Sequence, residues 1–168
     1  MIWIKLGVVL LSVALSARAR LDEIPEDGIT YKVKYPVDAW LIHAQDVGYS
    51  LQEARNLFYI RDYPATIITI ANFDPEFTIN FVRKDLTCYV RFTSGEPFLK
   101  ASFLFLKDVK AVYKVQQNKI LGMEMYEGGD ELKFAMILQE RGVNLTIVTH
   151  SRTSNFYWPV IHPSEIER

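Results

Sequence analysis

From residue 65 onward, apolar and polar side chains alternate along much of the chain, and this period of two is the feature that most restricts the fold. Within Glu131–Leu138, every second residue from Leu132 is apolar. Such alternation is typical of strands with one buried face. The predicted strands are Ala65–Phe73, Phe77–Val82, Leu86–Thr93, Leu99–Leu106, Val109–Val115, Ile120–Tyr126, Glu131–Leu138 and Val143–His150.

The breaks between these strands are short and rich in turn-forming residues, as at Ser94–Pro97 and Gly128–Asp130. Connections of about two to five residues join only antiparallel neighbours, because a parallel crossover needs roughly a dozen residues. We therefore predict a mainly β protein, an antiparallel up-and-down barrel of about eight strands. Closure removes exposed strand edges, and such a barrel can hold one small ligand. An open curved sheet wrapped on a helix fits the same pattern.

A helical segment is expected before the strands. Apolar residues recur every three or four positions from Trp40 to Phe58, which predicts one face of a helix. Asp38 is the expected N-cap, Gly48 interrupts the segment, and Ser50–Glu53 has the form of a capping box that starts a second short helix. The apolar face is expected to pack on the core of the domain, with a partner helix or a membrane as the alternatives.

The first residues have the pattern of a secretory signal peptide. A positive start with Lys5 is followed by an apolar run over residues 6–15 and by the small-x-small sequence Ala17–Ala19. The run is too short for a membrane-spanning helix, which needs about 20 residues. We therefore expect residues 1–19 to be removed from a secreted, extracellular chain without a membrane anchor. The alternatives are an uncleaved membrane anchor or a buried strand. Residues 20–168 are expected to form a single lipocalin-like domain that begins with an extended lead-in.

In a secreted chain, Asn144-Leu145-Thr146 is a predicted N-glycosylation sequon at Asn144. The composition argues against two other classes of protein. With 19 basic and 20 acidic residues, the chain is a poor electrostatic match for nucleic acid. With 49% hydrophobic residues, it is too apolar to be disordered.

Motifs for catalysis or metal binding are missing. His43, His150 and His162 stand in no metal-ligand spacing, and no nucleophile-elbow, phosphate-loop or dinucleotide-binding motif occurs. Cys88 is the single cysteine, and its place on the apolar face of a strand favours a buried inert thiol over a nucleophile. We therefore expect a binding protein without a metal or cofactor rather than an enzyme.

Several short segments match one known family in the same order along the chain. They are Asp38-Ala39-Trp40, Asn72-Phe73-Asp74-Pro75, Leu86-Thr87-Cys88-Tyr89-Val90, Ala101-Ser102-Phe103-Leu104-Phe105, Met125-Tyr126-Glu127 followed by Phe134, and Asn144–Thr149. Over Val37–His150 the chain resembles the tick salivary lipocalins, the family that includes the histamine-binding proteins. The resemblance implies a barrel that sequesters a small host mediator such as histamine, serotonin or a leukotriene, although some members bind complement protein.

The amine binders of that family pair the ligand ammonium with acids and stack its ring on aromatic side chains. Met136 and Thr146 fall where those proteins place aspartates, so we expect a lipid or eicosanoid ligand rather than a biogenic amine, bound by a monomer. The alternative is an inhibitor of a host protein, such as complement, that acts through the loops at the barrel rim. By position, the resemblance implies these ligand-binding residues: Asp74, Phe77, Glu124, Tyr126 and Phe134.

Two further expectations concern single residues. The resemblance implies that Cys88 is half of a disulfide whose partner is missing, together with the last strands and a C-terminal helix of the family. Glu124 shares a face of its strand with Gly122 and Tyr126. If that face is inward, Glu124 is an unpaired buried acid unless a ligand or a basic residue meets it; if outward, it is a solvated charge. The aromatic residues are also expected to fill the core if no ligand occupies it.

Overall fold

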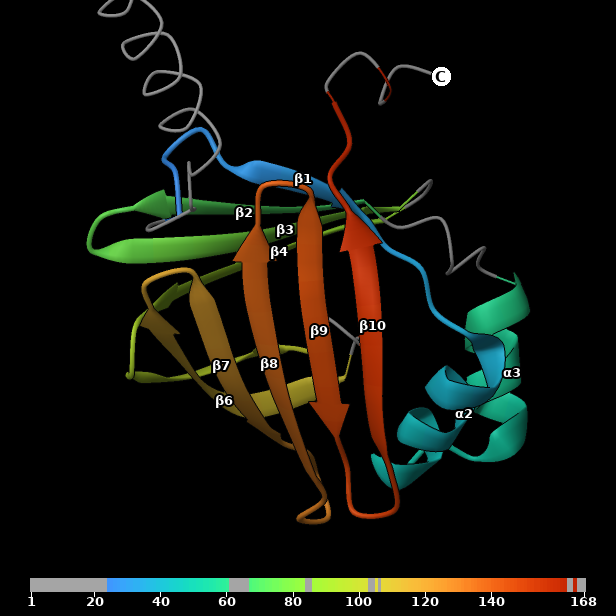
Figure 1. The fold of residues 1–168 in the computed structure, drawn as a ribbon. Coiled ribbons are helices and arrows are strands. Elements are labelled where there is room, and N and C mark those ends of the chain that lie inside the picture. The colour runs from blue at the N-terminus through green and yellow to red at the C-terminus, as the bar shows by residue number, and fades with distance from the viewer. Residues whose placement is uncertain are drawn as a thin grey trace, which may run out of the picture.

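The computed structural model describes residues 24–60, 67–83, 86–102, 105, 107–162 and 165. This part of the chain has ten strands and a pair of helices that follows the first strand (Figure 1). The helices are α2 (Val37–Asp46) and α3 (Leu51–Ile60). The strands are β1 (Ile29–Lys32), β2 (Ile67–Phe73), β3 (Glu76–Arg83), β4 (Leu86–Thr93), β5 (Pro97–Ala101), β6 (Asp108–Gln116), β7 (Lys119–Met125), β8 (Glu131–Gln139), β9 (Gly142–Val148) and β10 (Thr153–Pro159).

The strands form two antiparallel sheets that face each other. One sheet has the order β1-β2-β3-β4, and the other has the order β10-β9-β8-β7-β6-β5. The sheets meet where β1 lies beside β10, through a bridge between Tyr31 and Val160 and a hydrogen bond from the Ile161 N–H to the Thr30 carbonyl at 3.0 Å. Among the described residues, no ladder joins β4 to β5. The result is a barrel closed by hydrogen bonds along one seam (Figure 1).

The expectation of antiparallel strands is confirmed, but the expected number of about eight is too small. The lead-in contains β1, and β10 follows His150, where the resemblance implied that the last strands are missing. Alternate residues of β10 (Ser154, Phe156, Trp158) are buried, so the strand has the same period of two as its neighbours.

Most predicted strands match the structure to within two residues at each end, but one is wrong by more. The segment Leu99–Leu106 was expected to be extended, but β5 ends at Ala101. The Ser102 N–H donates to the Lys107 carbonyl at 2.6 Å, so the chain turns there and enters β6. Three residues of the expected strand, 103, 104 and 106, lie outside the described residues.

The helix pair differs from expectation at its start and agrees at its break. The N-cap of α2 is Pro36, without a side-chain capping bond, and Asp38 lies in the first turn instead. A carboxylate there is favourable because the helix dipole is positive at this end. Gly48 has a φ of +86°, the left-handed conformation that favours glycine after a helix. No described helix is long and apolar enough to cross a membrane.

The capping box of α3 is confirmed. The Ser50 N–H donates to Glu53 Oε2 at 2.8 Å, and the Glu53 N–H donates to Ser50 Oγ at 3.2 Å. The hydrogen bonds from Ser50 hold the pKa of the Glu53 carboxyl below its ordinary value. Two N–H groups at the start of α3 are thereby satisfied by local side chains.

The turn between the helices docks on the loop between β5 and β6. Lys107 Nζ donates to the carbonyls of Val47 and Gly48 at 3.3 and 3.0 Å and lies 4.0 Å from the centre of the Tyr49 ring. The Tyr49 hydroxyl donates to the Phe105 carbonyl at 2.5 Å. A cation at the end of α2 matches the negative end of the helix dipole. The helices therefore lie at the end of the barrel where β5, β7 and β9 end.

Candidate ligand-binding site

Glu124 lies on the inner face of β7, and its side chain is 0% exposed. Its neighbours on the same face, Gly122 and Tyr126, are buried as well, whereas Met123 and Met125 are exposed on the outer face. The alternation of buried and exposed residues along β7 therefore shows that the Glu124 side chain points into the barrel. An ionisable carboxyl in this position has lost its hydration and needs hydrogen-bond partners.

Three hydroxyl groups surround the Glu124 carboxyl. Ser102 Oγ donates to Oε2 at 2.6 Å, the Tyr126 hydroxyl donates to Oε2 at 2.7 Å, and the Tyr113 hydroxyl donates to Oε1. The Tyr126 and Ser102 oxygens are 2.8 Å apart, and Ser102 Oγ also accepts the Phe105 N–H at 3.3 Å. The Tyr126 hydroxyl is thus placed to donate to either Ser102 Oγ or Glu124 Oε2, and all three hydroxyl groups reach the carboxyl. We call Glu124, Ser102, Tyr113 and Tyr126 the carboxyl cluster.

Burial decides the electrostatics of the carboxyl cluster. Desolvation raises the pKa of Glu124 above its ordinary value, although the hydrogen bonds from Ser102, Tyr113 and Tyr126 lower it. Burial and the neighbouring Glu124 carboxylate raise the pKa of Tyr113, so this phenol keeps its hydrogen and remains a donor. Glu124 is therefore an inward acid that keeps its proton to a higher pH than a surface carboxyl does.

A row of aromatic rings leads from the carboxyl cluster across both sheets. The Tyr113 ring lies 5.0 Å from Phe134, 4.9 Å from Phe98 and 5.0 Å from Phe92, measured between ring centres. Phe92 in turn stacks on Phe77 at 5.8 Å. The edge-to-face and offset contacts are the arrangements that aromatic pairs favour. The row gives the interior a continuous apolar surface from β8 to β3.

The position of Phe134 in the aromatic row depends on a glycine of β7. Gly122 lies opposite Phe134 in the ladder between β7 and β8. A Cβ atom at Gly122 would lie 2.1 Å from two atoms of the Phe134 ring, which is far inside van der Waals contact. The missing side chain on β7 is therefore what lets the Phe134 ring lie over the strand beside Tyr113.

Two inward polar atoms have no hydrogen-bond partner among the described residues. They are the Tyr31 hydroxyl and the Asn72 Oδ1 atom. Tyr31 is opposite Ile68 on β2, and Asn72 is opposite Phe77 on β3, so both share the inner face of the first sheet. Burial raises the pKa of Tyr31 well above its ordinary value, so the group is a neutral phenol. Unsatisfied buried polar atoms are uncommon and often mark where a ligand or an ordered water binds.

A groove of about 670 Å³ reaches the carboxyl cluster from outside. Its lining is drawn from β5, β6, the end of β7 and the turn after β7, and it includes Tyr126, whose hydroxyl donates to Glu124. Leu99 and Met125 on its rim are exposed apolar side chains. The remaining lining residues are Lys100, Asp108, Val109, Lys110, Glu127 and Gly129.

The predicted site residues fall into two groups. Phe77 and Phe134 belong to the aromatic row, and Tyr126 and Glu124 belong to the carboxyl cluster. The structure therefore brings four of them into one connected interior. Asp74 is exposed in the turn between β2 and β3 and is not part of it.

The expectations for individual neighbouring residues have mixed outcomes. Met136 is buried on the inner face of β8, but Thr146 faces outward and donates to Asn155 Oδ1 at 2.7 Å, so it is not an interior position. Cys88 is a half-buried free thiol on the inner side of β4, and burial raises its pKa. A raised pKa lowers the thiolate fraction, which fits an unreactive thiol. Asn144 is exposed on β9.

Sequence reasoning missed two members of the carboxyl cluster. It considered only a basic residue or a ligand as partners of an inward Glu124, whereas the partners are hydroxyl groups. Tyr113 lies two positions from Ala111, the Cα partner of Glu124 on β6, so the ladder alternation could have indicated it once the register was known. Ser102 lies in a turn after β5, and no sequence signal places it beside β7.

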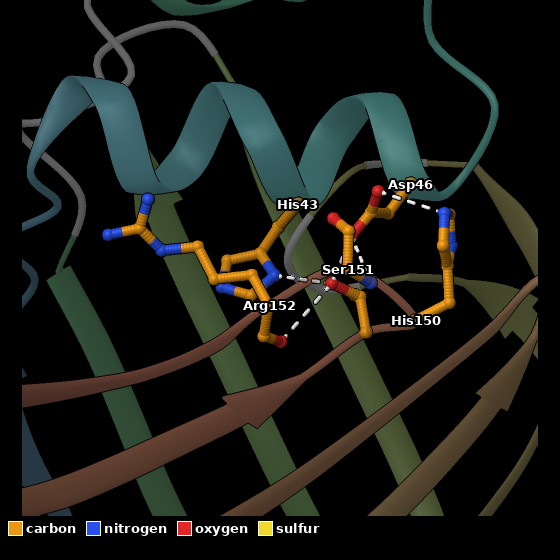
Figure 2. Close-up of polar contacts among 6 residues, drawn as sticks. His43, Asp46, His150, Ser151 and Arg152 are labelled. Carbon is orange, nitrogen blue, oxygen red and sulfur yellow. Dashed lines mark hydrogen bonds and ion pairs between the residues drawn. The ribbon is translucent and has the colours of Figure 1, made fainter.

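A second buried polar cluster joins α2 to the hairpin of β9 and β10 (Figure 2). Asp46 Oδ2 accepts hydrogen bonds from Thr149 Oγ1 and Ser151 Oγ, each at 2.5 Å, and from the Ser151 N–H at 3.2 Å. His150 Nε2 lies 3.4 Å from Asp46 Oδ1. Desolvation raises the pKa of Asp46, but the hydrogen bonds from Ser151 and Thr149 outweigh it and leave a net lowering.

The hydrogen-bond directions in this cluster fix the tautomer of His43. The Thr149 hydroxyl gives its one hydrogen to Asp46, so its oxygen accepts the Nδ1–H of His43 at 2.8 Å. Nε2 then accepts from Ser154 Oγ at 2.9 Å, and Ser154 Oγ accepts the Arg152 Nε–H at 3.0 Å. Burial lowers the pKa of His43, which Asp46 opposes and Arg152 supports, so the neutral ring is favoured.

A serine that donates to a histidine is also the arrangement of an activated nucleophile. Here Ser154 is buried, and it lines neither the groove beside β5, β6 and β7 nor the groove beside β8 and the turn after β9. The histidine is oriented by Thr149 and Asp46 under α2, so the cluster holds the helix on the hairpin. No group of three or more metal-ligating side chains occurs in the described part of the chain.

The fold is similar to that of solved fatty-acid-binding proteins. It superposes on the fatty-acid-binding protein isolated from Manduca sexta with a TM-score of 0.64 and 14% identity, over 82% of this chain and 99% of that one. The fatty-acid-binding protein from brain tissue of Drosophila melanogaster gives 0.62 and 11%, over 79% and 95%. Secretory abundant heat soluble protein 4 from Ramazzottius varieornatus gives 0.63 and 9%, over 84% and 96%. At these identities the likeness shows the fold alone.

The expected membership of the tick salivary lipocalins is wrong. The solved structures that the chain matches include several fatty-acid-binding proteins, and the sequence matches no family model and no curated protein. The helix pair lies between β1 and β2 and not after the last strand. Short motifs such as Asn72–Pro75 occur at strand ends in many antiparallel sheets, so their order was a poor guide to family. The ten strands of the described residues form an antiparallel barrel whose fold is similar to that of the fatty-acid-binding proteins.

Proposed function

We propose that this protein is a binding protein that holds one small, lipid-like molecule between its two sheets. The observation that carries the proposal is the interior itself. An aromatic row runs from Phe77 to the carboxyl cluster at Glu124, and polar atoms of Tyr31 and Asn72 on the facing sheet have no partner among the described residues. An apolar lining with a few convergent polar groups is the usual composition of a small-molecule site.

The similar structures support this proposal by their names. Several are called fatty-acid-binding proteins, one a fatty acid transporter and one a lipid-binding protein. Their fold is similar to the one found here. Because their sequence identity to this chain is low, the ligand of this chain has to be inferred from its own residues. Since Asp74 and Thr146 lie outside the interior, the proposal rests on the aromatic row and the carboxyl cluster.

We also propose that the protein is exported, with residues 1–19 as its signal peptide. These residues lie outside the described part of the chain, so the proposal rests on the charged, apolar and small-residue pattern of the sequence.

The test of binding is a ligand titration followed by thermal unfolding. A ligand at about 100 times its Kd stabilises the folded state by about 2.7 kcal/mol, which raises Tm by several degrees. The wild-type chain is expected to show this shift with dodecanol, dodecanoate or dodecylamine, each below its micelle concentration. The absence of a shift with all three would contradict the proposal.

A pair of variants locates the bound molecule. Phe98→Trp enlarges a ring of the interior row that contacts both Phe92 and Tyr113, and should weaken binding about tenfold by filling space. Tyr157→Trp makes a comparable change at an exposed position on β10 and should leave binding unchanged. Equal effects of the two variants would show that the ligand does not lie between the sheets.

A further inference from the structure

We propose that the helix pair of α2 and α3 detaches in acid from the hairpin of β9 and β10, because protonation of His43 breaks the contact between them. The inference goes beyond the proposed function, since it needs no bound ligand and concerns how one end of the barrel opens. It follows from the hydrogen-bond directions at His43, the charges around this ring and the way the helix pair is attached.

His43 is the side chain through which α2 meets the start of β10 (Figure 2). The residue is 1% exposed, and both ring nitrogens are engaged by the hairpin. Nδ1 donates to Thr149 Oγ1 at 2.8 Å, and Nε2 accepts from Ser154 Oγ at 2.9 Å. Because Thr149 gives its own hydrogen to Asp46, the direction of the bond at Nδ1 is fixed. The contact is therefore complete only with a neutral ring.

A second proton on the ring would turn Nε2 from an acceptor into a donor. Ser154 Oγ would then face this new N–H and also the Arg152 Nε–H, which it already accepts at 3.0 Å. The Ser154 hydroxyl hydrogen would lose its present acceptor in a buried place, where an unsatisfied donor is costly. After the helix leaves the hairpin, water accepts from both groups. Protonation of His43 therefore favours the detached form.

The charges that act on His43 have both signs. Burial lowers the pKa of the ring, the Asp46 carboxylate on the same helix raises it, and the Arg152 guanidinium on the hairpin lowers it. The net direction is down. The docked helix thus holds the ring in its neutral form, in agreement with the hydrogen-bond geometry.

The other charged side chains on the elements packed around α2 are exposed or engaged elsewhere. His150 Nε2 lies 3.4 Å from Asp46 Oδ1, and Lys107 donates to the carbonyls of Val47 and Gly48. Asp130 lies in the turn after β7, with Oδ2 close to Gly48. The exposed groups on the helices are Asp38, Glu53 and Arg55. Among the described residues, only Asp46 and Arg152 shift the pKa of His43 by their charge.

The helix pair is attached to the barrel by side-chain contacts and not by a strand ladder. Besides the contact at His43, Lys107 donates to the carbonyls that follow α2, and Tyr49 donates to the Phe105 carbonyl. The Trp40 ring packs on Phe105 at 5.2 Å between ring centres. Separate contacts of this kind can open while the sheets remain paired.

The interior of the barrel responds to acid in the opposite way. The strands are joined by continuous ladders, and α2 takes part in none of them. Burial raises the pKa of Glu124, so stability linked to this group is fully present in acid. Acid therefore weakens the contact of the helix pair and preserves the sheets, which makes the opening local.

Proton linkage sets the size of the effect. Between the lowered pKa of the docked ring and the ordinary value of 6.5, the detached form binds more protons than the docked form. Within this range, each unit of pH decrease raises the ratio of detached to docked molecules by up to about tenfold. The ratio is constant above the range and again below it.

Hydrogen–deuterium exchange measures this ratio for each segment. The full chain is exchanged at pH 7.5, 6.5, 5.5 and 4.5, and the rate of each peptide is divided by its intrinsic rate at that pH. The resulting opening ratio for α2 and α3 should rise at least about threefold between pH 7.5 and 4.5. Peptides from β7 and β8 should stay more protected than the helices at every pH, which also shows that the barrel is folded.

Three variants test whether His43 is the group that titrates. His43→Gln has a neutral side chain that still donates and accepts, so its opening ratio should not rise in acid, whatever its level at pH 7.5. Arg152→Gln retains an N–H donor for Ser154 and removes the opposing charge, so the rise should be smaller than in the wild type. His162→Gln, at an exposed histidine outside the cluster, is the matched control and should retain the wild-type rise.

Three results would overturn the inference. The first is a helix opening ratio in the wild-type chain that does not change with pH. The second is a rise that persists in His43→Gln. The third is equal opening of the helices and of β7 and β8 at every pH, which would mean that the helix pair opens only when the whole chain unfolds. No ligand enters these measurements, so each result leaves the proposed binding function standing.

Discussion

At the scale of single residues, Glu124 shows how a buried acid is accommodated without a cation. Three hydroxyl groups converge on its oxygens, and together they lower its pKa by less than burial raises it. The folded chain therefore holds this proton more tightly than the unfolded chain does. Stability linked to Glu124 is fully present below the ordinary pKa of 4.5 and is lost as pH rises through the raised value.

Replacement of Glu124 by glutamine should remove that loss. Glutamine has a similar shape and no proton to release, so the free energy of unfolding should no longer fall with rising pH above 4.5 in the way that the wild-type value does. Urea denaturation at a series of pH values measures it. Glu124→Leu should instead cost about 2–5 kcal/mol at every pH, because it strands the three hydroxyl donors. A wild-type profile that is parallel to that of Glu124→Gln would contradict the assignment.

The stability linked to His43 should change with pH in the opposite direction. Burial lowers its pKa, so stability is fully present above the ordinary value of 6.5 and is lost as pH falls through the lower, folded value. His43→Gln is expected to be less stable at neutral pH and to lack this acid-side decline. His162→Gln, at an exposed histidine, is the control and should keep the wild-type profile. An unchanged decline in His43→Gln would mean that another group titrates.

At the scale of elements, the helix pair and the strands depend on local devices. The capping box at Ser50 and Glu53 starts α3. Ser50→Ala removes one of its two bonds and should cost about 1 kcal/mol of stability, which thermal unfolding measures. Ser50→Thr retains a side-chain hydroxyl and should recover most of the loss. Equal losses in the two variants would show that the hydroxyl does not cap the helix.

The pairing of β7 with β8 depends on the space left by Gly122. Gly122→Ala should destabilise the protein by about 1–3 kcal/mol, because the new methyl group meets the Phe134 ring. Trimming that ring in Gly122→Ala/Phe134→Leu should restore part of the stability relative to the sum of the two single changes. A double-mutant cycle by chemical denaturation checks this, and simple additivity would contradict the contact.

At the scale of the whole molecule, two predictions concern export. Expression of the full chain in a eukaryotic secretory system should yield a product that begins at Arg20, as N-terminal sequencing would show. Glycan at Asn144 should add mass that a peptide N-glycosidase removes and that Asn144→Gln lacks. Its exposed position on the outer face of β9 leaves room for the sugar. Retention of the full chain inside the cell would contradict the first prediction.

The alternation of residues along strands and the capping of helices depend only on nearby residues, so both could be predicted from the sequence. The bounds of β4 were predicted as they occur, and the inner face of β8 is the predicted one. The capping box at Ser50 was also predicted correctly. β1 was not predicted because its four residues are too few to show a clear alternation. β10 was not predicted because the resemblance to the tick salivary lipocalins implied that the last strands were missing. The assignment failed because short turn and strand motifs reflect β structure in general.

The sequence by itself determined an antiparallel, mainly β chain with a two-part helical segment, because these properties follow from side-chain period and turn residues within a few positions. Only the tertiary structure decided that the ten strands form two sheets, that Ser102 and Tyr113 surround Glu124, and that His43 and Asp46 hold the hairpin of β9 and β10. The His43 and Asp46 contacts join residues more than a hundred positions apart. Their geometry depends on sheet register and closure, which no local pattern encodes.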